Sequence, residues 1–122
     1  MSKIYVPSRN DICWLDYEPT KGKEIGKYRP TLVLSSQEYN QKTGLLIGCP
    51  ISTSIRGSAT EVPVNYLESP SVIVSHLIHT LDWKQRQAKF IRQAEQSVVD
   101  GVLLRLISLI GADEVIEKVL NK

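Results

Sequence analysis

Short runs of β-branched, aliphatic and aromatic residues alternate with turn-forming residues along the first three quarters of the chain. Glycine, proline, asparagine and serine separate these runs, and no long helical pattern lies between them. Short strands at this spacing predict a small antiparallel barrel or curled sheet rather than βαβ units. The predicted strands are residues 12–15, 31–34, 45–47, 61–64 and 72–75, with a further strand over 85–92.

Two segments have helical features. Residues 35–38 read Ser-Ser-Gln-Glu and fit a capping box with the first serine as N-cap, and Gly44 is placed to end this short helix. Apolar residues recur at i, i+3 and i+4 spacing over residues 99–110. This spacing predicts a longer helix that packs on the sheet and ends at Gly111. Residues 112–122 are expected to add one or two amphipathic turns.

The composition fits a single small globular domain over residues 1–122. Of the 122 residues, 42% are hydrophobic and 23% are charged, a balance that excludes disordered and fibrous classes. The longest apolar run, 102–110, is interrupted by Arg105 and Ser108 and is far shorter than the ~20 residues of a membrane span. The N-terminus has no apolar signal segment, so we expect a cytoplasmic location and no membrane partner. Cys13 and Cys49 lie among apolar residues and are expected to be buried thiols rather than a disulfide or a reactive site.

The positive charges are concentrated in two segments, although the 15 Lys and Arg exceed the 13 Asp and Glu by only +2. Residues 17–30 are either a solvated hairpin connection or a functional loop; they lack the first glycine of a nucleotide-binding P-loop, which is therefore rejected. Residues 83–92 hold four cations and two aromatics with no carboxylate. That segment is either a surface for single-stranded nucleic acid or an edge strand that its cations protect from aggregation.

His76 and His79 give little indication of a metal site. Residues three apart in a strand point to opposite faces, and no cysteine or carboxylate stands at ligand spacing. We therefore expect no metal. Both histidines are interpreted as surface or hydrogen-bonded core residues, or as groups that bind a phosphate or carry a proton.

Several short sequence motifs occur together along the chain. They are residues 11–24, Tyr-Arg-Pro-Thr-Leu-Val-Leu-Ser at 28–35, Tyr-Asn at 39–40, Lys-Thr-Gly at 42–44, Pro-Ile-Ser-Thr at 50–53, Thr-Leu-Asp-Trp-Lys-Gln-Arg at 80–86 and Leu-Ile-Gly at 109–111. Together, over about residues 5–111, they resemble the MazF/PemK family of toxin endoribonucleases.

The resemblance implies an SH3-like β-barrel of the CcdB/MazF type with a short helix and a C-terminal helix. It also implies a homodimer and a cognate antitoxin partner, whose tail lies across the RNA site. The implied activity is ribosome-independent, sequence-specific cleavage of single-stranded RNA by attack of the ribose 2′-OH, which leaves 2′,3′-cyclic phosphate and 5′-OH ends. No cofactor is implied. Residues 112–122 are an extension beyond the family pattern.

The resemblance also assigns roles to individual residues. Arg29, directly before Pro30, matches the family's catalytic arginine and would stabilise negative charge on the phosphate. Glu24 matches a loop glutamate and is the candidate general base, although a salt bridge to a neighbouring cation is the alternative interpretation. Ser52 stands where the family usually has threonine; with Thr53, it would orient the phosphate through a hydroxyl donor.

His76 marks a larger departure from the family, because it stands where an aspartate is common. It either replaces that aspartate as a proton carrier or only lines the base-recognition groove. The candidates for holding RNA, with Tyr28 or Trp83 stacking on bases, are Lys23, Lys27, Tyr28, Arg56, His79, Trp83, Lys84 and Arg86. Because Ser52 and His76 depart from the family pattern, an alternative function remains open, that of a non-catalytic barrel that binds RNA or a protein target such as a topoisomerase.

Overall fold

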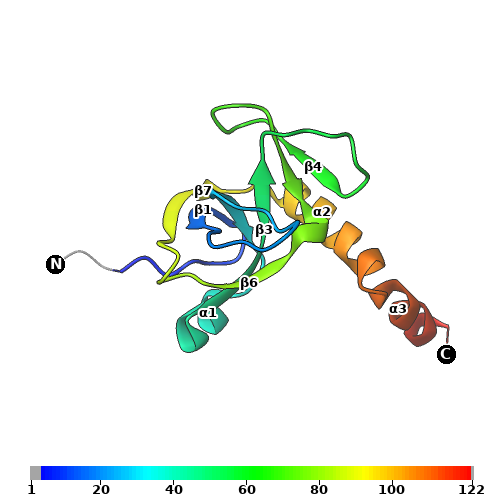
Figure 1. Ribbon diagram of the computed structural model, residues 1–122. Coiled ribbons are helices and arrows are strands. Elements are labelled where there is room, and N and C mark those ends of the chain that lie inside the picture. Colours follow the sequence, from blue (N-terminus) through cyan, green and yellow to red (C-terminus); the bar gives the residue numbers. More distant parts are fainter. Residues whose placement is uncertain (1–3, 122) are drawn as a thin grey trace.

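Seven strands form one curled antiparallel sheet in the computed structural model, which describes residues 4–121 (Figure 1). Neighbouring strands follow the order β4-β5-β3-β2-β1-β7, and β6 pairs with β3 off this path. The strands are β1 (Asp11–Asp16), β2 (Tyr28–Val33), β3 (Leu45–Ser52), β4 (Glu61–Val64), β5 (Ser71–Val74), β6 (His79–Asp82) and β7 (Lys89–Gln93). This architecture confirms the predicted small curled barrel.

The central strand, β3, is paired along both edges. Gly48 pairs with Val33 of β2 and with His79 of β6, so β2 and β6 lie on opposite edges of β3. Further along, Ile51 and Ser52 pair with β5. A Cβ atom at Gly48 would lie 2.5 Å from the Leu32 carbonyl oxygen, so this close approach of β2 requires glycine.

Three α-helices and one short 3₁₀ helix complete the structure. They are α1 (Gln37–Thr43), η1 (Ser75–Leu77), α2 (Gln96–Leu109) and α3 (Ala112–Leu120). Val99, Val102 and Leu106 of α2 are buried, and α2 lies beside β4 (Figure 1). Gly111 adopts a φ of +78° between α2 and α3, as its predicted place at the helix end requires. α3 extends away from the sheet and has no buried residue (Figure 1). No helix among residues 4–121 has the length and apolarity to cross a membrane.

The sheet is buried on both faces because β1 and β2 contribute side chains to two cores. Ile12 and Leu32 pack with Ile73 and α2 in the first core, whereas Leu15 and Val33 belong to the second. Cys13 and Cys49 are buried free thiols, as predicted, and burial raises the pKa of each to about 12. Both therefore stay protonated at neutral pH.

Two local predictions were wrong. The N-cap of α1 is Ser36, whose Oγ accepts from the Tyr39 amide at 3.2 Å, because the side chain of Ser35 turns inward to bond Asn40. The sixth predicted strand begins only at residue 89, since residues 83–87 form a turn. Strand β6 was not predicted because its four residues show no clear alternation.

Asn40 ties α1 to the N-terminal segment from a fully buried position. Its side-chain nitrogen donates to the Pro7 carbonyl at 2.8 Å, and its oxygen bonds the Ser35 hydroxyl at 2.5 Å. We expect Asn40→Ala to lower the free energy of unfolding by about 2–3 kcal/mol, because it leaves buried polar partners unpaired. Urea denaturation measures this loss. Gln41→Ala, at an exposed position of the same helix, is the control, and an equal loss in both variants would contradict the account.

Candidate functional site

The strand register brings the polar residues of the site together. Thr31 of β2 pairs with Pro50 of β3, and the same antiparallel register, continued by two residues, places Arg29 opposite Ser52. Ser52 in turn pairs with Val72 of β5. The ends of three neighbouring strands therefore converge on one place.

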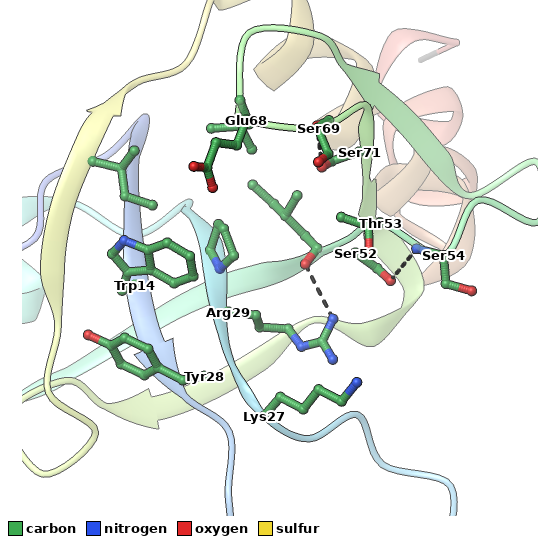
Figure 2. A pocket seen from close by; sticks show the side chains of 14 residues that line it. Trp14, Lys27, Tyr28, Arg29, Ser52, Thr53, Ser54, Glu68, Ser69 and Ser71 are labelled. Atoms are coloured by element: carbon green, nitrogen blue, oxygen red, sulfur yellow. Dashed lines mark hydrogen bonds between the residues drawn. The ribbon is translucent and has the colours of Figure 1, made fainter.

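A cavity of about 660 Å³ lies at this place (Figure 2). The predicted site residues that line it are Lys27, Tyr28, Arg29, Ser52 and Thr53. Its volume falls in the ~300–1,000 Å³ range of small-molecule pockets. The structure thus brings together the predicted arginine and both predicted hydroxyls.

The Arg29 guanidinium is held by main-chain carbonyls. Nε donates to the Gly26 carbonyl at 2.7 Å, and Nη1 donates to the Ile51 carbonyl at 3.4 Å. The only side-chain ion pair within residues 4–121 joins Lys42 to Glu38 on α1, so no described carboxylate lies within ion-pair distance of Arg29. Partial burial lowers the pKa of Arg29, but a guanidinium stays protonated at neutral pH. The positive charge is therefore available to an anion in the cavity.

Ser52 and Thr53 supply hydroxyls at the end of β3. The Ser52 Oγ accepts from the Ser54 amide at 3.0 Å, as Figure 2 shows. Since the oxygen acts as acceptor in this bond, the Ser52 hydroxyl proton stays free to donate. Thr53 is exposed at the cavity.

An aromatic pair forms another side of the cavity. Trp14 stacks on Tyr28 with ring centroids 5.4 Å apart and an interplanar angle of 10°, and Tyr28 donates to the Gln87 carbonyl at 3.1 Å. Sequence reasoning did not assign Trp14 to the site. The available signal was its position between Cys13 and Leu15, both buried, which places Trp14 on the opposite face of β1.

Glu68 and Ile91 also line the cavity without having been predicted. Phe90 pairs with Cys13 and Arg92 with Ile12, so Ile91 is the extra residue of a β-bulge in β7. Bulges re-aim side chains beside functional sites. Glu68 lies in the loop between β4 and β5, and its carboxylate is directed into the cavity (Figure 2).

Several predicted residues lie outside the cavity lining. The Glu24 carboxylate accepts from the Lys21 amide at 2.7 Å within the exposed loop, and none of the predicted salt bridges to neighbouring cations forms. His76 lies in η1, where its Nδ1 shares a hydrogen bond of 2.7 Å with the Thr60 hydroxyl. The remaining candidates outside the lining are Lys23, Arg56, His79, Trp83, Lys84 and Arg86.

Trp83 and Arg86 were expected to contact RNA, but both make hydrogen bonds within the protein instead. Trp83 is only 3% exposed, and its indole nitrogen donates to the Asn40 carbonyl at 2.8 Å, so its ring is not open to a base. Arg86 Nη1 donates to the carbonyls of Asp16 and Glu18 at 2.9 and 3.0 Å. The two residues fix the core and the hairpin loop, respectively.

Comparison with known proteins places the chain in a family. Residues 8–110 match the model of the PemK-like, MazF-like toxin of type II toxin–antitoxin systems. The chain belongs to the PemK/MazF toxin family. The endoribonuclease toxin MazF of Escherichia coli is 37% identical over 88 residues, which cover 72% of this chain and 79% of MazF. The E. coli endoribonuclease toxin ChpB is 33% identical over 108 residues, which cover 84% of this chain and 92% of ChpB.

Solved structures support the same assignment. MazF from Deinococcus radiodurans superposes with a TM-score of 0.85 at 36% identity, covering 88% of this chain and 99% of that one. A MazE–MazF complex from the same organism gives a TM-score of 0.79 at 36% identity over 88% and 98% of the two chains. The fold is therefore the SH3-like, CcdB-like fold of MazF toxins. The family match ends at residue 110, so α3 lies beyond it.

No group of three or more His, Cys, Asp or Glu side chains in the described part of this MazF-like toxin is arranged to hold a metal ion. His79 instead packs edge-on against Tyr17, with ring centroids 5.6 Å apart. The cavity offers two cations, hydroxyl donors and an aromatic surface, together with one carboxylate. These groups suit a phosphate joined to a planar ring.

Arg86 fixes the hairpin loop of this PemK/MazF-like chain, so its removal should affect stability. We expect Arg86→Ala to lower the free energy of unfolding by about 1–2 kcal/mol, because two carbonyls lose a charged donor. Lys84→Ala is the control, since the Lys84 ammonium lies over the Trp83 ring and is exposed. Urea unfolding of both variants provides the measurement; unchanged stability of Arg86→Ala would refute the structural role.

Proposed function

We propose that this chain is an endoribonuclease toxin that cleaves single-stranded RNA at specific sequences without a ribosome or a metal ion. The observation that carries the proposal is the Arg29 guanidinium, which has no carboxylate partner within residues 4–121 and lines one cavity with Ser52 and Thr53. The names of the E. coli relatives, both endoribonuclease toxins, support this activity.

The proposed reaction uses a nucleophile that RNA itself carries. The ribose 2′-oxygen forms a bond to the adjacent phosphorus while the bond from phosphorus to the 5′-oxygen breaks. The 2′-hydroxyl gives its proton to a base, and the departing 5′-oxygen takes up a proton. The products carry a 2′,3′-cyclic phosphate and a 5′-hydroxyl.

Arg29, Ser52 and Thr53 are the proposed phosphate-binding groups. Negative charge on the nonbridging oxygens increases as the 2′-oxygen attacks, and a fixed guanidinium stabilises it. Because main-chain carbonyls already hold the guanidinium, little reorganisation accompanies the reaction. This positive charge replaces the usual role of a metal ion at phosphorus, and no cofactor is needed.

Glu24 is the proposed general base. Its carboxylate now accepts from the Lys21 amide, and it lies three residues before Lys27, whose side chain lines the cavity. For this role the carboxylate has to leave that amide and reach the ribose, a rearrangement within one exposed loop. His76 remains the alternative proton carrier, although it is hydrogen-bonded to Thr60 outside the cavity lining.

The proposal includes a homodimer and a cognate antitoxin as partners, in the cytoplasm. The Deinococcus relative was solved as a MazE–MazF complex. Leu104 of α2, Ile110 directly after α2 and Leu120 of α3 are 66%, 71% and 77% exposed. These large apolar side chains support association with another protein surface.

Replacement of Arg29 tests the activity directly. We expect the wild-type protein to cleave a long single-stranded RNA in EDTA and Arg29→Ala to cleave it about 100-fold more slowly or worse. Arg29→Lys keeps the charge but loses the planar fork, so its rate should fall between the two. Lys118→Ala, an exposed cation on α3, is the matched control. End analysis should find 2′,3′-cyclic phosphate and 5′-hydroxyl termini.

Absence of cleavage by the folded wild-type protein would reject the enzyme and favour the non-catalytic barrel. If Arg29→Ala cleaved RNA as fast as the wild-type protein, the proposed mechanism would be rejected, whereas the proposed endoribonuclease activity would stand.

The role of Glu24 as the proton acceptor is tested by its amide variant. We expect Glu24→Gln to lower the cleavage rate by about 10²–10⁴-fold, because an amide cannot accept the hydroxyl proton. Single-turnover cleavage of the same RNA provides the measurement. His76→Gln serves as the competing variant: if it lowers the rate by this factor and Glu24→Gln does not, the proton carrier is His76.

A further inference from the structure

The site cavity has two chemically different sides. Lys27, Arg29 and Ser52 lie on one side, whereas Trp14 and Glu68 lie on the other (Figure 2). The first side suits a phosphate, because it offers two cations and a hydroxyl. The second side lines the same cavity, and its only charge is negative, so it is unsuited to phosphate.

The second side has the composition of a nucleobase pocket. The Trp14 indole provides an aromatic face, and Pro30, Leu67 and Ile91 add apolar lining. Stacking on Tyr28 fixes the orientation of the indole, with ring planes 10° from parallel. Unpaired RNA bases bind to such surfaces by stacking, while polar groups at the rim read their edges.

Glu68 is the charged group positioned to read a base edge. Its side chain is exposed, its carboxylate is directed into the cavity, and it accepts no hydrogen bond from the other cavity-lining residues drawn in Figure 2. Both carboxylate oxygens are therefore available as acceptors, and a carboxylate has no proton to donate when ionised. The ligand edge that fits best presents two donors side by side.

Guanine is the RNA base with this edge. Its N1–H and N2–H groups are adjacent and parallel, so one carboxylate can accept from both. Uracil places carbonyl oxygens on either side of its single N–H, and adenine and cytosine place a ring acceptor beside the amino group. Acceptors facing a carboxylate repel it, so these three bases fit less well.

We propose that the Trp14 and Glu68 side of the cavity is a guanine-selective base pocket beside the reacting phosphate. The inference rests on the proposed action on RNA and adds the identity of one base. Trp14 stacks on the guanine ring, and Glu68 accepts from its N1–H and N2–H. The base enters between these groups while its phosphate lies against Arg29.

Binding of small probes tests the pocket independently of cleavage. Calorimetry with the four nucleoside 3′,5′-bisphosphates should show that the wild-type protein binds the guanosine compound about tenfold or more tightly than the uridine compound. Glu68→Gln should reduce this ratio to about threefold or less, because it exchanges one acceptor oxygen for a donor. Glu114→Gln, an exposed carboxylate on α3, should leave the ratio unchanged.

Sequencing of cut ends from a randomised RNA provides the second measurement. We expect guanine at one position next to the cut in the wild-type pattern and loss of that preference alone in Glu68→Gln. The inference is overturned if wild-type binding shows no guanine preference, or if Glu68→Gln keeps it. It is also overturned if Glu68→Gln slows cleavage of all sequences equally, since Glu68 would then be a general base. Guanine-selective binding without any RNA cleavage would support the pocket and reject only the proposed function.

Discussion

Hydrogen bonding along both edges of β3 is the constraint on which the site depends. At Gly48 the strand pairs with β2 and β6 together, and the Leu32 carbonyl approaches so closely that no side chain fits. This pairing fixes the register of β2, and the register then places Arg29 opposite Ser52. The proposed phosphate-binding groups are thus positioned by main-chain ladders, which are stiffer than loops. Lys27 and Glu68, in contrast, lie in loops and complete the cavity from outside the sheet.

Much of the fold could be predicted from the sequence because local patterns and burial agree. The alternation within the strands and the helical spacing of residues 99–110 arise from the same two cores that the structure contains. The sequence alone could not show which of the two successive serines is the N-cap of α1. The distant Ile47 amide donates to the Ser35 hydroxyl, and this bond leaves Ser36 as the N-cap. Short β6 carries little pattern of its own, and its place depends on pairing with β3.

The candidate site was predicted only in part, because residue type and sequence spacing do not reveal the direction in which a side chain points. Arg29, Ser52 and Thr53 were predicted from the family resemblance, and all three line the same cavity. Trp83 was predicted as a residue that stacks on bases, but it is buried, since neighbouring cations do not indicate which side of a turn faces the core. Glu68 gave no signal, because a single carboxylate in a loop becomes part of a cavity only when the loop folds over β2 and β3.

Arg29 is held by main-chain carbonyls rather than by a carboxylate, and this affects which ions in solution can bind to it. Carbonyl dipoles orient the guanidinium but do not neutralise it, and no described side chain acts as its counter-ion. Any small oxyanion of suitable size is then a competitor for the site, and the surrounding salt screens the attraction of larger ones. We therefore expect sulfate or phosphate in a purification buffer to compete weakly for the proposed phosphate site, whereas chloride of the same ionic strength should only screen.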